Sequence, residues 1–240
     1  MLEIINVSKS YDGKKNAVDN VSLTINKGDI YGFVGHNGAG KTTLLKSIVG
    51  LIDFDSGDIL VNGVSVKKDI MGVKKQIAYV PDNPDVYETM KGIEYLNFIA
   101  DAFKVTEERR IELINKYAKL FGMENVLTQT IQEYSHGMKQ KIVLISALIH
   151  EPKVLLLDEP FVGLDPQASF LLKNEFKAMC EKGSSIFFST HVLEVVEKLC
   201  NKVAIIKNGK IVESGLTEKI ISNKSLETIF MELEKEYDVS

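Results

Sequence analysis

The sequence predicts a mixed α/β fold: a mainly parallel sheet flanked by helices, an antiparallel β part near the N-terminus and an inserted helical stretch. Three observations carry this expectation. Short runs that are apolar on both faces recur with helical patterns between them, which is typical of a parallel sheet covered on both sides. Two Asn-Gly pairs indicate hairpins, and one interval between apolar runs is far longer than a single crossover needs.

The expected core strands are five short apolar runs, each bounded by polar or turn residues. Their β-branched and aromatic content and their length of four or five residues favour buried strands over helices. These runs are IYGFV, IAYV, VLLL, SIFF and VAII, at residues 30–34, 77–80, 154–157, 185–188 and 203–206.

The turn signals place antiparallel strands near both ends of the chain. Asn62-Gly63 and Asn208-Gly209 each separate two alternating or apolar runs. Two-residue Asn-Gly loops are the strongest short-range signal of a β-hairpin, because both residues tolerate the positive φ angles that the turn requires.

Residues 81–153 separate two consecutive core strands, although a crossover needs only about a dozen residues. We therefore expect an insertion, with residues 84–150 as a helical subdomain and residues 1–83 and 151–240 as the α/β core of a single domain, 1–240. Thr106 is the expected cap of the second inserted helix. The two apolar stripes at helical spacing are Ile93, Leu96, Ile99, Ala100, Phe103 and Ile111, Ile114, Tyr117, Ala118, Phe121.

Charge and composition exclude several classes of protein. The net charge is −4, so bulk nucleic acid is not the expected partner. Of the 29 basic residues only Arg109 and Arg110 are arginines, which excludes a lid of several arginines over a phosphoryl group. Cys180 and Cys200, the two cysteines, have no metal or redox spacing and are expected to be buried thiols. With no signal peptide or apolar run of bilayer length, we expect a cytoplasmic chain.

The strongest local signal is GHNGAGKTT, Gly35 to Thr43, directly after the first core run and before a helical pattern. It matches the phosphate-binding P-loop, in which backbone amides form an anion nest. In this reading Lys41 reaches the outer phosphates and the Thr42 hydroxyl binds Mg²⁺. The remaining residues of the predicted nucleotide-binding loop are His36, Asn37, Gly38, Ala39, Gly40 and Thr43.

Two carboxylates follow the third core run. In VLLLDEP, Asp158 and Glu159 come where a buried strand reaches the edge of the sheet, which is where ligands bind in open parallel sheets. We expect Asp158 to hold Mg²⁺ directly or through water. Glu159 is suited to orient or deprotonate the water that attacks the γ-phosphate.

Over residues 1–220 the chain resembles the ATP-binding cassette (ABC) family, the ATP-hydrolysing subunits of membrane transporters. The resemblance rests on the P-loop, the DEP strand end, YSHGM (134–138), GLD (163–165), STH (189–191) and the order of these motifs. It implies a homodimer with two nucleotide sites at a head-to-tail interface. Ser135, His136 and Gly137 would then contact the nucleotide held by the other subunit, and Ser135 also looks like a helix N-cap.

The resemblance assigns roles to four further residues. His191 takes the position of the family's switch histidine, beside the γ-phosphate, and Asp165 the position that couples the two sites. Asp165-Pro166 also reads as the start of a helix, and both readings can hold. Tyr11 is the expected aromatic platform for the adenine ring, with Val18 as a possible apolar contact.

The sequence departs from the family pattern at two places. Where family members generally carry a glutamine that senses Mg²⁺, this chain has Asp82, which we expect to be a Mg²⁺ or water ligand with a shorter, charged side chain. The common signature LSGGQ is replaced by YSHGM, which puts the hydrogen bond of its final glutamine in doubt. Such versions resemble those of exporter-type and drug-resistance-type members.

The expected function is therefore an ATPase subunit that uses ATP and Mg²⁺, dimerises, and drives a separate integral membrane permease, with export as the expected direction. It would sit on the inner face of the membrane through that permease, which would rest in a groove of this chain beside the helical subdomain and the Asp82 loop, near residues 86–90. One alternative is a soluble ABC-type ATPase acting on ribosomes or DNA, and another is a small-molecule phosphotransferase. Residues 217–240 are expected to form either a cap on the core or a docking helix.

Overall fold

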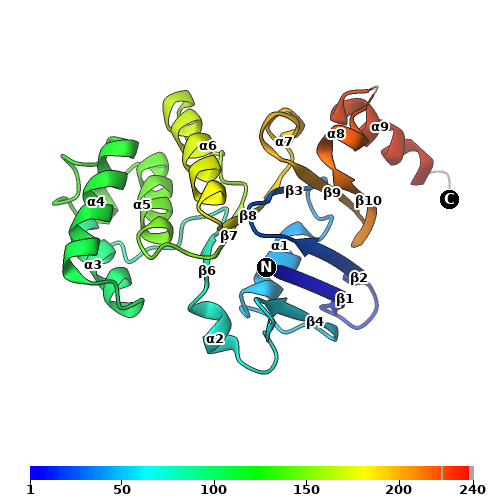
Figure 1. Cartoon of the computed structure of the whole chain (residues 1–240), viewed down its shortest axis with the longest axis horizontal. Coiled ribbons are helices and arrows are strands. Elements are labelled where there is room, and N and C mark those ends of the chain that lie inside the picture. The colour runs from blue at the N-terminus through cyan, green and yellow to red at the C-terminus, as the bar shows by residue number, and fades with distance from the viewer. Residues whose placement is uncertain (223, 238–240) are drawn as a thin grey trace.

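Two sheets organise the computed structural model, which describes residues 1–222 and 224–237 (Figure 1). The four-stranded antiparallel sheet has the order β2-β1-β4-β5, with β1 (Leu2–Ser10), β2 (Asn16–Ile25), β4 (Ser56–Val61) and β5 (Val64–Ser65). The six-stranded sheet has the order β10-β9-β3-β8-β7-β6. Its strands are β3 (Ile30–Val34), β6 (Ile77–Val80), β7 (Val154–Asp158), β8 (Ser185–Thr190), β9 (Lys202–Lys207) and β10 (Lys210–Leu216).

The five predicted core runs are the five parallel strands of the larger sheet, so this prediction is confirmed. β7 and β8 run beyond their apolar runs, to Asp158 and Thr190, and Asp158 pairs with Ser189. Polar side chains on β7 and β8 are therefore held side by side at the carboxyl edge of the sheet.

Both Asn-Gly hairpins are confirmed. β4 and β5 pair antiparallel across Asn62-Gly63, and β9 and β10 pair antiparallel across Asn208-Gly209. The φ angles of Asn62 and Asn208 are 49° and 50°, in the left-handed region that this type of turn demands.

Alternate residues of the six-stranded sheet belong to two hydrophobic clusters, one on each face. One face packs on the antiparallel sheet and α1 (Lys41–Ile48). The other is covered by α6 (Pro166–Glu181), α7 (Leu193–Leu199) and the inserted helices. This layering leaves the carboxyl ends of β3, β7 and β8 uncovered as a common edge.

The inserted stretch is helical, as predicted, with α3 (Gly92–Ala102), α4 (Glu107–Phe121), the short 3₁₀ turn η1 (Ile131–Glu133) and α5 (His136–Leu148). Thr106 caps α4, because its hydroxyl accepts a hydrogen bond from the Arg109 amide. Two members of the predicted stripes, Phe103 and Ile111, are exposed, and Leu113 is buried in place of Ile111. The boundaries at 84 and 150 stay a prediction.

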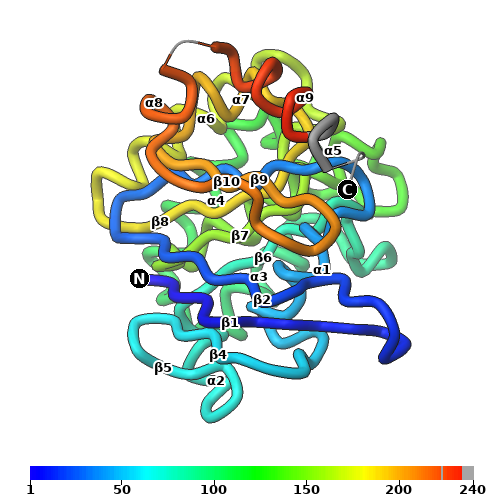
Figure 2. Tube along the Cα trace, turned by 90° about the vertical axis from the view of Figure 1, so that its right-hand side faces the viewer, coloured from blue at the N-terminus to red at the C-terminus, as the bar shows by residue number. Residues whose placement is uncertain are grey.

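The C-terminal part of the chain packs against α7. Figure 2 shows α8 (Thr217–Ile220) and α9 (Leu226–Tyr237) beside α7, at the opposite end of the molecule from α2 (Ile70–Lys74). Leu226 is fully buried, and its amide donates to Glu197 Oε2 at 3.2 Å. Such packing fits a cap on the core. Residues 223 and 238–240 of the predicted segment lie outside the described residues.

Cys180 and Cys200 are both buried and form no disulfide, the Cys180 thiol donates to the Asp29 carbonyl oxygen at 3.5 Å, and burial raises the pKa of both thiols. The expectation of unreactive core thiols agrees with this placement. Among residues 1–222 and 224–237, none of the helices combines the length and apolar character that crossing a bilayer requires.

Candidate functional site

The P-loop between β3 and α1 is shaped by close backbone packing. Gly40 has a φ of 112°, and a Cβ there would lie 2.2 Å from the carbonyl oxygen of Ala17 on β2. A Cβ on Gly35 would lie 2.5 Å from the carbonyl oxygen of Ile206 on β9. The loop therefore packs directly against the backbone of β2 on one side and of β9 on the other. Neither position 40 nor position 35 has room for a Cβ atom, so both require glycine.

Lys41 lies at the centre of the loop and is 6% exposed. Its Nζ donates to the carbonyl oxygens of Gly35 at 2.6 Å and His36 at 3.2 Å, and lies 3.8 Å from Glu159 Oε1. Burial lowers the pKa of Lys41, whereas Glu159, Asp158 and Asp82 oppose that shift. The loop therefore holds a cation in place beside the acidic edge of the sheet.

Asp158 is the most enclosed carboxylate of the site, at 2% exposure. The Thr42 hydroxyl donates to its Oδ2 at 2.6 Å, and the Ser189 hydroxyl donates to its Oδ1. These two contacts fix the plane of the carboxylate and confirm that Thr42 and Asp158 meet. The orienting role of Ser189 was not predicted, although this residue belongs to the STH motif.

Glu159 follows Asp158 with a φ of 50°, and its amide donates to the Ser189 carbonyl at 3.1 Å. This left-handed conformation turns the chain sharply at the strand end. His191 Nδ1 lies 3.0 Å from Glu159 Oε1, and the His191 amide donates to Oε2 at 3.4 Å. His191 itself is 55% exposed. The geometry places His191 at the same edge as Glu159, as the resemblance implied, and shows that the two side chains contact each other directly.

Asp82, which follows β6, lines the same cavity as Asp158 and Glu159. Its pKa is raised, first by burial and then by these two carboxylates, while His136 and His191 pull it down. The negative charge of these neighbouring carboxylates would attract a cation bound beside them. Asp82 is an exposed residue of this cavity, and its role as a metal ligand stays a prediction.

The donor set fits Mg²⁺. Within the described part of the chain no group of three or more His, Cys, Asp or Glu side chains could by itself hold a metal ion. Mg²⁺ usually keeps several waters and takes one or two carboxylates together with substrate phosphates. The Asp158 carboxylate and the Thr42 hydroxyl are such a set, and Asp82 supplies a further oxygen nearby.

A cavity of about 350 Å³ opens over the loop. Tyr11, at 66% exposure, lies at its side with its hydroxyl 3.3 Å from Thr43 Oγ1, and Lys9 Nζ lies 5.7 Å from the centroid of its ring. Val18 does not fit its expected role, because it is fully buried in the core, and Ala17 lines the cavity instead. The lining residues are Tyr11, Ala17, His36, Asn37, Gly38, Gly40, Lys41, Thr42, Thr43, Asp82, Asp158 and Glu159.

The signature residues lie apart from this cavity in the same chain. Ser135 caps α5, since its hydroxyl accepts from the Met138 amide at 3.3 Å. Neither Ser135 nor its neighbours His136 and Gly137 line the cavity, and both Ser135 and His136 are exposed. Tyr134 is buried and donates to the carbonyl oxygen of Val126 at 2.7 Å, which gives the unusual first residue of the signature a structural role.

Asp165 caps α6, and Pro166 takes the first helical position, as predicted. Asp165 Oδ1 accepts from the Ala168 amide at 2.8 Å. Its other oxygen, Oδ2, accepts from Lys141 Nζ on α5 at 2.8 Å, a contact that sequence reasoning did not foresee.

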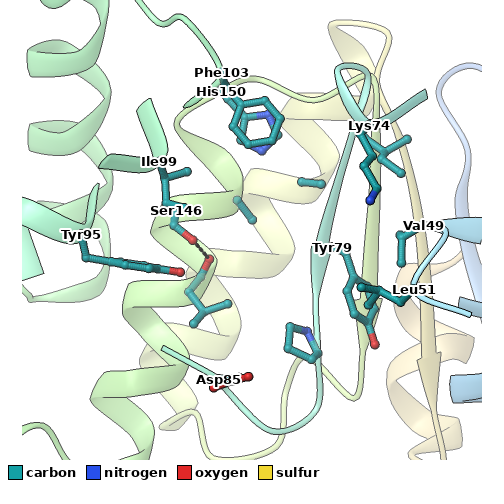
Figure 3. A pocket seen from close by; sticks show the side chains of 15 residues that line it. Val49, Leu51, Lys74, Tyr79, Asp85, Tyr95, Ile99, Phe103, Ser146 and His150 are labelled. Carbon is teal, nitrogen blue, oxygen red and sulfur yellow. Dashed lines mark hydrogen bonds between the residues drawn. The ribbon is translucent and has the colours of Figure 1, made fainter. Parts of the chain in front are cut away.

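A second cavity, of about 310 Å³, lies between β6, α3 and α5 (Figure 3). The rings of Phe103 and His150 are stacked in its wall with centroids 3.7 Å apart. Tyr79 Oη and His150 Nδ1 are buried with no hydrogen-bond partner among the described residues. The cavity is lined by Val49, Leu51, Lys74, Ile77, Ala78, Tyr79, Pro81, Asp85, Tyr95, Ile99, Phe103, Val143, Ser146, Ala147 and His150.

Comparisons with known proteins agree with this geometry. The family model described as ABC transporter matches residues 18–162. An uncharacterized ABC transporter ATP-binding protein, YhcH of Bacillus subtilis, is 36% identical over 215 residues, covering 89% of this chain and 69% of the relative. The linearmycin resistance ATP-binding protein LnrL of the same organism is 33% identical, covering 95% and 73%. A solved ATP-binding subunit of an ABC transporter is 31% identical, with a TM-score of 0.94 and coverage of 98% and 99%.

Proposed function

This chain belongs to the ABC transporter family of ATP-binding proteins, and on that premise we propose that it hydrolyses ATP as a dimer around two MgATP and drives a separate integral membrane permease. The observation that carries the proposal is the convergence at one sheet edge. There the P-loop lysine, the Thr42–Asp158 pair and the Glu159–His191 pair lie around one cavity.

The residues divide the chemistry of phosphoryl transfer among them. The P-loop amides and Lys41 bind the phosphates. For this, Lys41 gives up its hydrogen bonds to the carbonyl oxygens of Gly35 and His36 and donates to phosphate oxygens instead. Thr42 and Asp158 would hold Mg²⁺, which when bound neutralises charge on the outer phosphates. Glu159 accepts the proton of the attacking water, and His191 keeps the Glu159 carboxylate in place.

The dimer supplies what one chain lacks. The exposed first turn of α5, with Ser135, His136 and Gly137, adds amides and the positive end of a helix dipole to the nucleotide of the other subunit. With only two arginines in the sequence, this contribution replaces an arginine finger. In support, none of these three residues lines the nucleotide cavity of its own chain.

The second cavity is the proposed docking site of the permease. Exposed apolar side chains surround it: Leu51 and Phe103 in its wall, and Tyr87 and Phe98 beside it. An apolar cavity with exposed aromatic residues at its rim is typical of a site for a partner helix. Docking there would hold the chain at the inner face of the membrane. A resistance protein among the relatives supports export as the direction.

Hydrolysis is tested by Glu159→Gln, which keeps the shape of the side chain but cannot accept a proton. The variant should bind ATP, release phosphate at least about a hundredfold more slowly, and accumulate as an ATP-dependent dimer. Gel filtration with light scattering and a phosphate-release assay measure both effects. Release of phosphate at the wild-type rate would remove Glu159 from this role.

Assembly of the site from two chains has its own test. Ser135→Arg and Lys41→Ala subunits should each be inactive alone, whereas their mixture should regain activity because one site of each heterodimer is intact. A tag on each subunit isolates the heterodimer. A purified heterodimer without any recovered hydrolysis would exclude assembly in trans.

A further inference from the structure

The loop between β7 and α6 leads from Glu159 to Asp165 and is fixed at both of its ends. Near its start, Phe161 packs edge-on against Phe188 of β8, with ring centroids 5.7 Å apart. At its end, Asp165 caps α6. Between these ends Val162 and Gly163 are exposed, and Asp165 is exposed as well. The position of this part of the loop therefore depends on the neighbouring elements that contact it.

The first turn of α5 packs on it. A Cβ on Gly137 would lie 2.8 Å from the carbonyl oxygen of Gly163, which is closer than such atoms approach. A Cβ on Gly163 would lie 3.1 Å from Cδ2 of His136. The turn that carries Ser135, His136 and Gly137 is thus in direct backbone contact with the loop that begins at Glu159.

Lys141 adds a second contact four residues further along α5, on the same face of the helix as Gly137. Its Nζ donates to Asp165 Oδ2 at 2.8 Å, while the cap contact to Ala168 uses Oδ1. The Lys141 bond is the first cause of the lowered pKa of Asp165. Two contacts about one helical turn apart therefore join the loop to α5.

We propose that Lys141 is a positioning residue of the ATPase cycle, which through Asp165 ties the loop after Glu159 to the first turn of α5. This inference rests on the proposed function, in which Glu159 serves one nucleotide and Ser135 of the same chain serves the other. Because the loop is joined to the first turn of α5, a displacement of the loop at one nucleotide also shifts the contact that the same chain makes with the other nucleotide. The ion pair is partly exposed and adds little to folding stability, so a variant that lacks it should fold normally and can be compared with the wild type in turnover.

Lys141→Met tests the tie, since it removes the charge and keeps the apolar stem. The expected result is a kcat for ATP about tenfold lower with KM changed less than about twofold, and recovery of most of the rate by Lys141→Arg. Lys116→Met is the matched control. Lys116 also joins the inserted helices to α6, through an ion pair with Glu175 at 2.6 Å, and its loss should leave the rate unchanged.

Hydrogen exchange of the amides of residues 161–165 gives a readout that needs no hydrolysis. In the nucleotide-free protein these amides should exchange faster in Lys141→Met than in the wild type or in Lys116→Met. A wild-type protein without ATPase activity would refute the proposed function, whereas the exchange experiment would still test the tie. The inference is overturned by unchanged exchange, by a kcat equal to that of Lys116→Met, or by an arginine variant as slow as the methionine variant.

Discussion

Replacing His150 by phenylalanine should remove much of the acid sensitivity of folding. His150 lies in the wall of the second cavity, with its ring parallel to Phe103 within 7°. Burial lowers the pKa of His150 from 6.5 to about 4, and its Nδ1 has no partner among the described residues. Lys74 and Asp85 line the same cavity, but neither contributes to this shift. The lowered pKa of His150 is therefore caused by its burial in the cavity wall.

The direction in which the free energy of unfolding changes with pH follows from how many protons the folded and unfolded states bind. The unfolded chain protonates this histidine near pH 6.5, whereas the folded protein keeps it neutral until about pH 4. The unfolded state binds more protons in this window, so the free energy of unfolding falls as the pH falls from 6.5 to 4. Linkage gives a loss from this one group of about 2 kcal/mol at pH 5 and about 3 kcal/mol at pH 4.

Urea denaturation of the wild type and His150→Phe at pH 7.5 and pH 5 measures this loss. Phenylalanine keeps the flat ring against Phe103, so the variant should lose about 2 kcal/mol less than the wild type between the two pH values. Other titrating groups act equally in both proteins and cancel. An equal loss in His150→Phe and the wild type would refute the reasoning.

Three further predictions concern the nucleotide site. Thr42→Ala removes one proposed Mg²⁺ ligand and should raise the Mg²⁺ concentration for half-maximal hydrolysis by about tenfold, with activity abolished by EDTA in the wild type. Asp82→Gln removes the extra carboxylate and should weaken Mn²⁺ binding to the nucleotide complex, measured by electron paramagnetic resonance; unchanged binding would exclude Asp82 as a ligand. Tyr11→Ala should raise the Kd for ATP about tenfold or more, while Tyr11→Phe, which keeps the ring, should stay within about twofold in a fluorescent-nucleotide titration.

Much of the fold could be predicted because the core strands have a distinctive pattern. The runs at 30–34 and 77–80 are apolar on both faces, and only a sheet covered by other layers buries such strands. Placing Asp158 at the edge of that sheet then predicted its contact with the P-loop, since parallel strands bring their carboxyl ends together. The observed Thr42–Asp158 hydrogen bond is the physical result of that topology.

Other features depend on details that a sequence pattern does not contain. Val18 was expected to be accessible, but Asn20 has a φ of 53°, so the alternation of β2 slips and both Val18 and Val21 point into the core. The Lys141–Asp165 contact joins residues of different helices and depends on how α5 is rotated. Periodicity also does not predict how a helix is rotated about its axis, that is, which of two neighbouring residues faces the core. The sequence therefore assigned Ile111 to the core, whereas Leu113 is buried there.

The pairing of β6 with β7 has an evolutionary consequence. These strands are hydrogen-bonded neighbours, although residues 81–153 leave the sheet after one and return at the other. The two ends of this excursion are therefore anchored together whatever its length. Substitutions and insertions between these strands therefore leave their register unchanged. Under the proposed function, α3 and α4 can diverge along with the membrane partner, while Asp82 and the first turn of α5 in the same stretch stay constrained by the nucleotide.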